Sequence, residues 1–353
     1  MKEVIDAIDE WLAAGEVGIA LATVITTWGS APRKVGAKMA FTAEGRAIAG
    51  SVSGGCVEGA VIEAGGEVLA TNRPQLLHFG VADETAWSVG LACGGEIDVF
   101  VERLDVLAYA SAREQVVANQ PVTIVTVIRG DDEQIGRHLI VTDEAVSGTL
   151  GAAWDERVIE LTRRTRQSTR MALLDEVELF VDVVRPSPAL VIVGGAHIAV
   201  ALAKLATILG YRTVVIDPRR AFGSQARFAG VDKLVSLWPD KAFEDTPLRS
   251  DMAVVTLSHD PKIDDPALQA ALASDVFYIG ALGSRSTHAR RRERLSALGF
   301  DNTQLGRIHA PVGLDIGADN PEEIALAIMA EVVAAYRQAG QLRAGSNQTT
   351  SRP

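Results

Sequence analysis

Residues 190–199 read LVIVGGAHIA, and this stretch decides the fold of the second half of the chain. Its four apolar residues predict a short buried strand, and the pair Gly194-Gly195 predicts a tight turn into a helix. A second apolar stretch, residues 213–216, ends at Asp217. A strand, a glycine turn, a helix and a second strand that ends in an acidic residue form the first unit of a Rossmann-type fold.

The glycine turn departs from the dinucleotide-binding pattern at one position. Gly194 stands first, Ala199 takes the third place, and Asp217 lies where an acid accepts a ribose hydroxyl. Ala196 stands second, and its methyl group occupies space that a pyrophosphate needs. The helix N-terminus after the turn is still a potential anion site. The sequence therefore predicts the fold, while binding of NAD(P) stays open.

Two later strands end in polar residues. The apolar stretch 252–257 is followed by Ser258, His259 and Asp260, and the stretch 276–279 is followed by GALGSR. Carboxyl ends of parallel strands form the ligand-binding edge of such sheets. Ser284 and Arg285 begin the next helix, and we expect them to hold a phosphate there.

The segment RPSP at residues 185–188 predicts a linker, because each proline disfavours helix at the preceding residue. We expect an α/β protein in which a mixed α+β domain, residues 1–184, precedes a Rossmann-like parallel-sheet domain, residues 187–340. The first 103 residues predict a mixed sheet with few helices. Residues 341–353 are polar and lack periodicity, which predicts a disordered tail.

The composition is that of an ordinary globular protein, with 48% hydrophobic and 22% charged residues among 353. A net charge of −11 argues against nucleic acid or an anionic membrane as the partner, since both attract basic surfaces. Two cysteines and an N-terminus without an apolar leader segment favour a reducing, cytoplasmic location.

Two loops in the first domain each place a cysteine beside a glycine pair. They are SGGCVE at residues 53–58 and LACGGE at residues 91–96. Glycine pairs let the backbone approach a ligand and expose N–H groups, which also favour a thiolate. Both cysteines could equally be small buried residues. Arg33 and Lys38 lie upstream and would supply positive charge for an anionic ligand.

The chain resembles the xanthine dehydrogenase accessory (XdhC/CoxI) proteins. The resemblance rests on GSAPRKVGAKM, GSVSGGCVEGA, GLACGGEIDVFVE, the GGAHIA unit with IDPR, YIGALGSR, and PVGLDIGADNPEEIALAIMAEVVA, in this order along nearly the whole chain. It implies a chaperone that binds molybdenum cofactor. It also implies that the chaperone helps to exchange an oxo for a sulfido ligand, with a cysteine desulfurase as donor. The product would enter a xanthine dehydrogenase-family molybdoenzyme.

By position, the resemblance makes Cys56 and Cys93 the cofactor-contacting thiols, in loops shaped by their neighbouring glycines. GGAHIA differs from the G-x-G-H-x-G of relatives, which again leaves nucleotide binding open. No pattern predicts a catalytic triad, a paired-carboxylate site or a zinc site. The candidate cofactor-binding residues are Cys56, Cys93, Gly54, Gly55, Gly94, Gly95, Arg33, Lys38, Gly194, Gly195, His197, Asp217, Ser284 and Arg285.

Three functions compete. The first is an accessory chaperone without turnover, the second an NAD(P)-dependent oxidoreductase, and the third a subunit or scaffold of the dehydrogenase. We also expect a homodimer, because the apolar helix at residues 324–333 needs covering.

Overall fold

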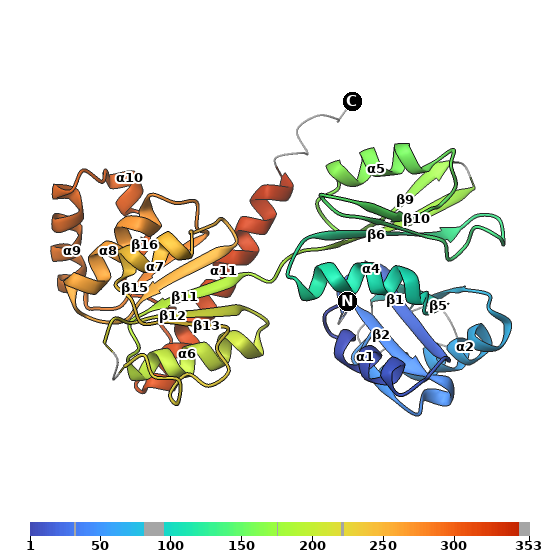
Figure 1. Ribbon diagram of the computed structural model, residues 1–353, viewed down its shortest axis with the longest axis horizontal. Coiled ribbons are helices and arrows are strands. Elements are labelled where there is room, and N and C mark those ends of the chain that lie inside the picture. The colour runs from blue at the N-terminus through green and yellow to red at the C-terminus, as the bar shows by residue number, and fades with distance from the viewer. Residues whose placement is uncertain (32, 81–94, 175, 220–221, 346–353) are drawn as a thin grey trace. The chain divides into compact units, whose positions relative to one another are not determined.

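The computed structural model describes residues 1–31, 33–80, 95–174, 176–219 and 222–345. The chain forms two compact units, Met1–Pro186 (unit 1) and Ser187–Pro353 (unit 2), as Figure 1 shows. The boundary between them falls inside the proline-containing segment 185–188.

Unit 2 is built on a parallel sheet, as predicted. Its strands run in the order β13-β12-β11-β14-β15-β16, and all the described pairings are parallel. The central strand is buried along its whole length because helices cover both faces of the sheet. The strands are β11 (Ala189–Val193), β12 (Arg212–Ile216), β13 (Lys233–Val235), β14 (Met252–Thr256), β15 (Tyr278–Ala281) and β16 (Ile308–His309).

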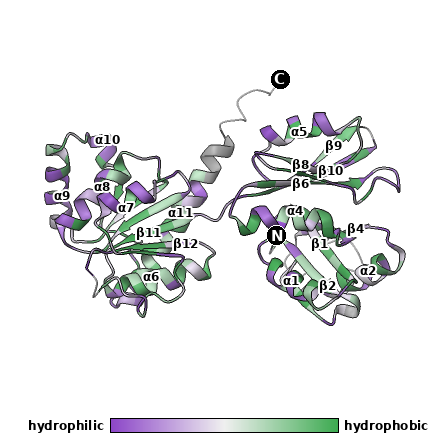
Figure 2. Cartoon of the chain, viewed as in Figure 1, coloured by the Kyte–Doolittle hydropathy of each residue, from purple (hydrophilic) through white to green (hydrophobic). Residues whose placement is uncertain are grey.

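Helices α6 (His197–Ile208) and α11 (Pro321–Gly345) cover one face of this sheet. The opposite face packs against α7 (Pro239–Asp245), α8 (Pro261–Leu272), α9 (Arg285–Ala297) and α10 (Asn302–Leu305). Figure 2 shows the resulting pattern, with hydrophobic inner strands and a hydrophilic α9 on the outside.

Helix α11 corrects two expectations. The helix continues to Gly345, so the predicted tail does not begin at residue 341, and residues 346–353 lie outside the described part of the chain. Ile328 and Val332 on this helix are buried in the same apolar cluster as Leu202 and Ala206 of α6. The apolar stretch is thus covered within its own unit, which removes the reason given for a homodimer.

Unit 1 contains two antiparallel sheets. Sheet A has the order β3-β2-β1-β5-β4, so the expectation of a mixed sheet is wrong for the described strands. Sheet B has the order β8-β7-β6-β10-β9. The strands are β1 (Ile19–Trp28), β2 (Lys38–Thr42), β3 (Ile48–Gly50), β4 (Gln75–Phe79), β5 (Glu96–Arg103), β6 (Val122–Arg129), β7 (His138–Val141), β8 (Val146–Gly148), β9 (Thr169–Leu174) and β10 (Val177–Val184).

The helices of unit 1 join these sheets into one body. Tyr109 and Ala112 of α4 share an apolar cluster with Leu21 of sheet A and Ile124 of sheet B. Helix α2 packs on sheet A, and α5 packs on sheet B through Val158. The helices are α1 (Ile5–Ala13), α2 (Glu58–Thr71), α4 (Val106–Val117) and α5 (Asp155–Arg164), with a short 3-10 turn η1 (Ala43–Gly45).

Candidate functional site

Three loops of unit 1 meet at one edge of sheet A. Strand β1 ends at Trp28, β3 ends at Gly50, and β5 begins at Glu96. Trp28 pairs with Glu96, and the strands are antiparallel, so these three ends lie at the same edge. The described residues next to these strand ends are residues 29–31 and 33–37 after β1, residues 51–57 after β3, and Gly95 before β5.

The loops contact one another directly. Arg33 Nε donates to the carbonyl of Ser51 at 3.1 Å, and its guanidinium also pairs with Glu3. A Cβ atom on Gly95 would lie 2.9 Å from the carbonyl oxygen of Trp28, so only glycine permits this approach. Cys93 and Gly94 lie outside the described residues. The edge thus gathers the predicted residues Arg33, Gly54, Gly55, Cys56 and Gly95.

The loop after β3 folds around the carboxylate of Glu58, a residue that the sequence motifs did not single out. Ser51 Oγ donates to this carboxylate at 2.6 Å, and Ser53 donates both its hydroxyl and its N–H. Gly54 and Gly55 add their N–H groups at 3.1 and 2.9 Å. Burial alone would raise the pKa of Glu58, but the hydrogen bonds from the Ser51 and Ser53 hydroxyls and the Ser53 N–H lower it to about 2. The loop therefore encloses a permanently ionised carboxylate at neutral pH.

This arrangement corrects the expectation that the amides of Gly54 and Gly55 face a ligand, because both donate to Glu58 instead. The N–H of Cys56 donates to Ser53 Oγ at 2.9 Å, which ties the cysteine to the same network. Cys56 is a half-buried free cysteine and packs against the apolar cluster between α2 and sheet A. The loop thus holds a thiol in a fixed place and keeps its glycine amides occupied.

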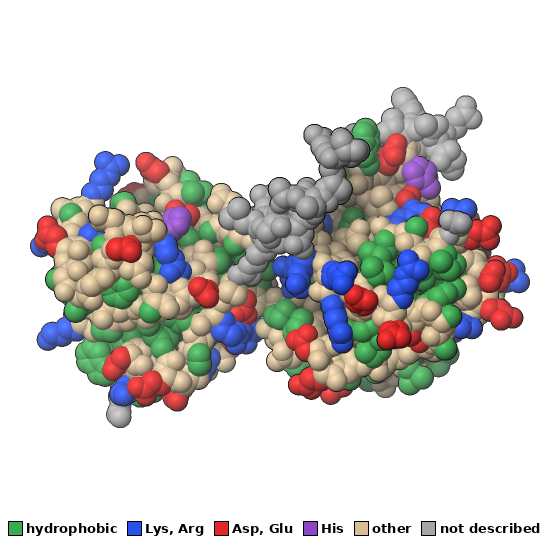
Figure 3. All heavy atoms as spheres, turned by 90° about the horizontal axis from the view of Figure 1, so that it is seen from above, with side chains coloured by type: hydrophobic (Ala, Val, Ile, Leu, Met, Phe, Trp, Pro, Cys, Tyr) green, Lys and Arg blue, Asp and Glu red, His purple; other side chains and the backbone are tan. Residues whose placement is uncertain are grey.

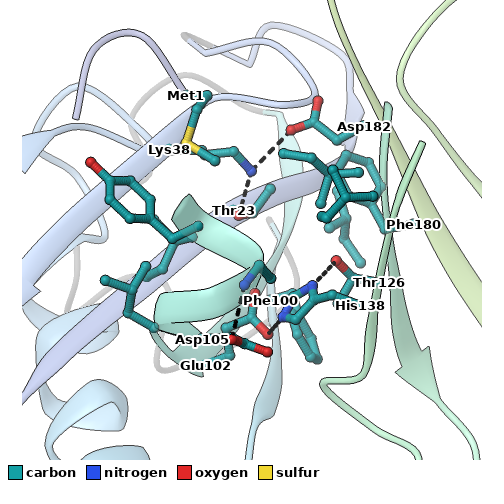
Figure 4. A pocket seen from close by; sticks show the side chains of 17 residues that line it. Met1, Thr23, Lys38, Phe100, Glu102, Asp105, Thr126, His138, Phe180 and Asp182 are labelled. Carbon is teal, nitrogen blue, oxygen red and sulfur yellow. Dashed lines mark hydrogen bonds and ion pairs between the residues drawn. The ribbon is translucent and has the colours of Figure 1, made fainter. Parts of the chain in front are cut away.

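Lys38 lies in the core of unit 1 and not at the loop edge. Its ammonium contacts Asp182 Oδ2 and Thr23 Oγ1, both at 3.0 Å, and the residue is 4% exposed. The three residues line a cavity of about 30 Å³ between the two sheets (Figure 4). Burial would raise the pKa of Asp182, but the Lys38 ammonium holds it below its usual value. Lys38 is a structural ion-pair partner, which corrects its predicted contact with the cofactor.

A second ion pair, between His138 and Glu102, lines the same cavity. His138 Nε2 lies 3.1 Å from Glu102 Oε2, and His138 Nδ1 lies 3.1 Å from Thr126 Oγ1. Figure 4 shows the imidazole between these two partners. Burial disfavours the charged imidazole, but Glu102 and Asp105 raise the pKa of His138 above its usual value. Both ion pairs join a strand of sheet A to a strand of sheet B.

The stability of unit 1 is expected to depend on pH through His138. Because the folded-state pKa is raised, the pair stabilises the fold fully below about pH 6.5, and this stabilisation is lost as the pH rises through the folded-state pKa. Urea unfolding between pH 6 and pH 9 should show a steeper loss of stability for the wild type than for His138→Gln. His197→Gln, at a side chain 78% exposed, is the matched control and should follow the wild type. Equal slopes for the wild type and His138→Gln would contradict this assignment.

In unit 2, the glycine turn after β11 is packed against other parts of its own chain. Gly194 has φ +101°, and a Cβ atom there would lie 2.7 Å from the Ser258 nitrogen. The N–H of Gly195 donates to Asp217 at 2.7 Å, and Arg219 donates to the same carboxylate at 2.7 and 2.9 Å. Asp217 is fully buried. A ribose hydroxyl would have to compete with these donors, so its predicted role stays a prediction.

The remaining predicted residues of unit 2 lie at helix N-termini. His197 is the first residue of α6, and its Nε2 lies 3.9 Å from Glu322. Ser284 caps α9 by accepting the N–H of Thr287, and Arg285 is the first residue of that helix.

Figure 3 shows one face of the molecule with its charged side chains scattered among apolar ones. Within the described ranges, no three His, Cys, Asp or Glu residues are grouped to hold a metal ion. None of the described helices is long and apolar enough to cross a membrane.

Comparisons with known proteins agree with this architecture. Residues 190–332 match the family model described as the XdhC Rossmann domain, and residues 11–80 match the XdhC and CoxI family. A Bacillus subtilis protein, named as a probable xanthine dehydrogenase subunit, is 30% identical over 321 residues, which are 89% of this chain and 92% of the relative. The chain belongs to the XdhC and CoxI family.

Two further likenesses extend over most of the chain. The Escherichia coli protein "Molybdenum cofactor insertion chaperone PaoD" is 29% identical over 92% of this chain and 85% of its own length. A crystal structure of a xanthine dehydrogenase from Bacillus halodurans has a TM-score of 0.77 at 25% identity and covers 98% of this chain and 97% of its own. The family and the Rossmann fold predicted from the sequence are thus confirmed.

Proposed function

We propose that this XdhC and CoxI family protein binds molybdenum cofactor at the loop edge of sheet A and delivers it to a xanthine dehydrogenase-family molybdoenzyme. The observation that carries the proposal is the meeting of the Cys56 loop, the Arg33 loop and Gly95 at that edge. The relative named as a molybdenum cofactor insertion chaperone supports the same role.

The residues at this edge suit such a cargo. A thiol is a soft donor that molybdenum accepts, and a guanidinium binds anionic oxygen atoms. Cys56 offers the thiol, and Arg33 offers a one-third exposed guanidinium, whose equally exposed partner Glu3 the anionic cargo would have to replace. Glu58 keeps the cysteine loop in one conformation before any cargo arrives, which lowers the entropic cost of binding. We include Cys93 and Gly94 in the site by position, although they lie outside the described residues.

We propose that the cargo is also sulfurated while it is bound. One oxo ligand would be exchanged for one sulfido ligand with release of water, and a cysteine desulfurase persulfide together with a thiol reductant would supply the sulfur. The accessory protein contributes binding and positioning, and the desulfurase contributes the sulfur chemistry. The chain is then a transfer protein of the cytoplasm and performs no turnover of its own.

A transfer assay tests the proposed function. The purified protein, loaded with molybdenum cofactor, is mixed with the cofactor-free form of a xanthine dehydrogenase-type enzyme, and recovered activity is compared with that from the same amount of free cofactor. We expect faster and more complete activation by the loaded protein, with no stable complex in gel filtration afterwards. A stable stoichiometric complex would favour the subunit interpretation, which the name of the Bacillus subtilis relative also suggests. Equal activation by free cofactor would contradict a delivery role.

Tight binding of NAD(P) is not expected. A dinucleotide would use the Asp217 carboxylate and the Gly195 N–H, but these two groups are hydrogen-bonded to each other. The Arg219 guanidinium donates to both oxygen atoms of the same carboxylate. Equilibrium dialysis against NAD(H) and NADP(H) should therefore give no dissociation constant below about 0.1 mM. This dissociation constant corresponds to a binding free energy of about −5 to −6 kcal/mol. Arg219→Ala should free the carboxylate and strengthen any residual binding. Micromolar binding by the wild type would revive the oxidoreductase hypothesis.

A further inference from the structure

The turn between β15 and α9 presents a cluster of donors at the carboxyl end of the parallel sheet. Gly283 has φ +133°, and a Cβ atom there would lie 3.0 Å from Thr287 Cγ2, so the turn requires glycine. The hydroxyls of Ser286 and Thr287 lie 2.9 and 3.1 Å from Ser284 Oγ. Arg285 is exposed in the same turn. Alone, this would be an ordinary capped helix start.

Arg291 provides a second and independent observation. It lies further along α9, its side chain is 2% exposed, and its Nη2 donates to the carbonyl of Leu282 at 2.8 Å. The same nitrogen would be 3.8 Å from a Cβ atom on Gly283, so the guanidinium lies directly behind the turn. Its Nε and Nη1 have no hydrogen-bond partner among the described residues. A buried guanidinium with two unused nitrogens is costly and calls for an explanation.

Nearby carboxylates compensate this charge only in part. Asp264 lies 3.8 Å from Arg291 Nη2, beyond hydrogen-bond distance, and its other oxygen accepts the Ser258 hydroxyl at 2.6 Å. Asp265 is held by Arg294 through two hydrogen bonds of 2.6 and 2.9 Å. The positive charge of Arg291 is therefore only partly neutralised by these carboxylates, and it lies next to the turn.

We propose that the first turn of α9, with Gly283, Ser284 and Arg285, binds the phosphate group of a phosphate ester, and that the buried Arg291 supports it from behind. The N–H groups at the start of α9 that the Ser284 hydroxyl does not cap donate to the phosphate. The hydroxyls of Ser284, Ser286 and Thr287, which contact one another in the free protein, turn toward the ligand, and the helix dipole and two arginines supply positive charge. Arg291 is a positioning residue, because its guanidinium contacts the turn and not the ligand. The ester belongs to a nucleotide or to the pterin cofactor, and only the second source rests on the proposed function.

Calorimetric titration with inorganic phosphate, AMP and adenosine tests the site. We expect phosphate and AMP to bind and adenosine not to bind. The double variant Ser284→Ala/Arg285→Ala should lose about tenfold or more in AMP affinity. Arg290→Ala, at an exposed arginine of the same helix, is the matched control and should bind AMP as the wild type does. Absence of phosphate binding, or equal weakening by Arg290→Ala, would overturn the proposal.

Two further arms separate the roles and the sources. Arg291→Lys should keep AMP affinity within a few-fold, whereas Arg291→Met should lose it while circular dichroism shows an intact fold. Equal affinity in both variants would remove Arg291 from the site.

To identify the molecule that carries the phosphate, the affinity for molybdenum cofactor is compared before and after phosphatase treatment. A loss of affinity on treatment that disappears in Ser284→Ala/Arg285→Ala identifies the pterin phosphate. An unchanged cofactor affinity alongside AMP binding identifies a free nucleotide, and this result leaves the cofactor edge of unit 1 unaffected.

Discussion

Asp182→Ala is expected to lower the free energy of unfolding of unit 1 by about 3–5 kcal/mol, the usual cost of leaving one partner of a buried ion pair alone. The Lys38 ammonium would stay buried between the two sheets with the Thr23 hydroxyl as its remaining hydrogen-bond partner among the described residues. Urea unfolding, followed by tryptophan fluorescence and by circular dichroism, measures this loss.

A second variant shows whether the charge or the space causes the loss. In Lys38→Met/Asp182→Leu, both charges are replaced by apolar side chains of similar size, and we expect much of the stability to return. Because the two residues lie on strands of different sheets, recovery in the double variant would show coupling across the cavity. A loss in the double variant equal to the sum of the two single losses would contradict that coupling.

Glu58→Ala is expected to destabilise the protein by about 2–3 kcal/mol and to release the Cys56 loop, because it removes the common acceptor of the loop hydrogen bonds. The released thiol should react faster with Ellman's reagent. Since the pKa of Glu58 is lowered to about 2, its contribution is present above about pH 4.5 and is lost only as the pH falls toward 2.

Two controls belong to this prediction. Glu58→Gln keeps the size of the side chain but places an NH₂ group where N–H donors now point, so we expect an intermediate loss. Glu63→Gln, at an exposed acid of the same helix, should leave both stability and thiol reactivity unchanged. An unchanged thiol reaction in Glu58→Ala would show that the carboxylate does not hold the cysteine loop.

The parallel sheet of unit 2 could be predicted because its signals are local. The apolar run 190–193 is followed directly by the turn at Gly194. Only one helix separates this turn from the next apolar strand, which is followed by Asp217. Unit 1 was harder: β8 is exposed throughout and β9 has only one buried residue, so neither shows a clear alternation. Helix α5 lies in the same part of the chain, and only Val158 and Thr162 are buried on it.

At the candidate site, residue types could be predicted but not their partners. Cys56 follows a glycine pair, Gly95 belongs to one, and both residues lie at the loop edge. The pairs Lys38–Asp182 and Glu102–His138 join residues far apart in sequence, so only the packing of sheet A on sheet B reveals them. Glu58 had a local signal, because serines five and seven residues before a glutamate can satisfy its carboxylate.

The proposed function depends most on Cys56 as a cofactor-contacting thiol. The most direct measurement is the amount of molybdenum and of pterin that elutes with the protein in anaerobic gel filtration after loading with molybdenum cofactor. We predict close to one cofactor per chain for the wild type, and a loss of at least about tenfold in affinity for Cys56→Ser, with the fold intact by circular dichroism. Undiminished cofactor binding in both Cys56→Ser and Cys56→Ser/Cys93→Ser would contradict this role of the cysteines.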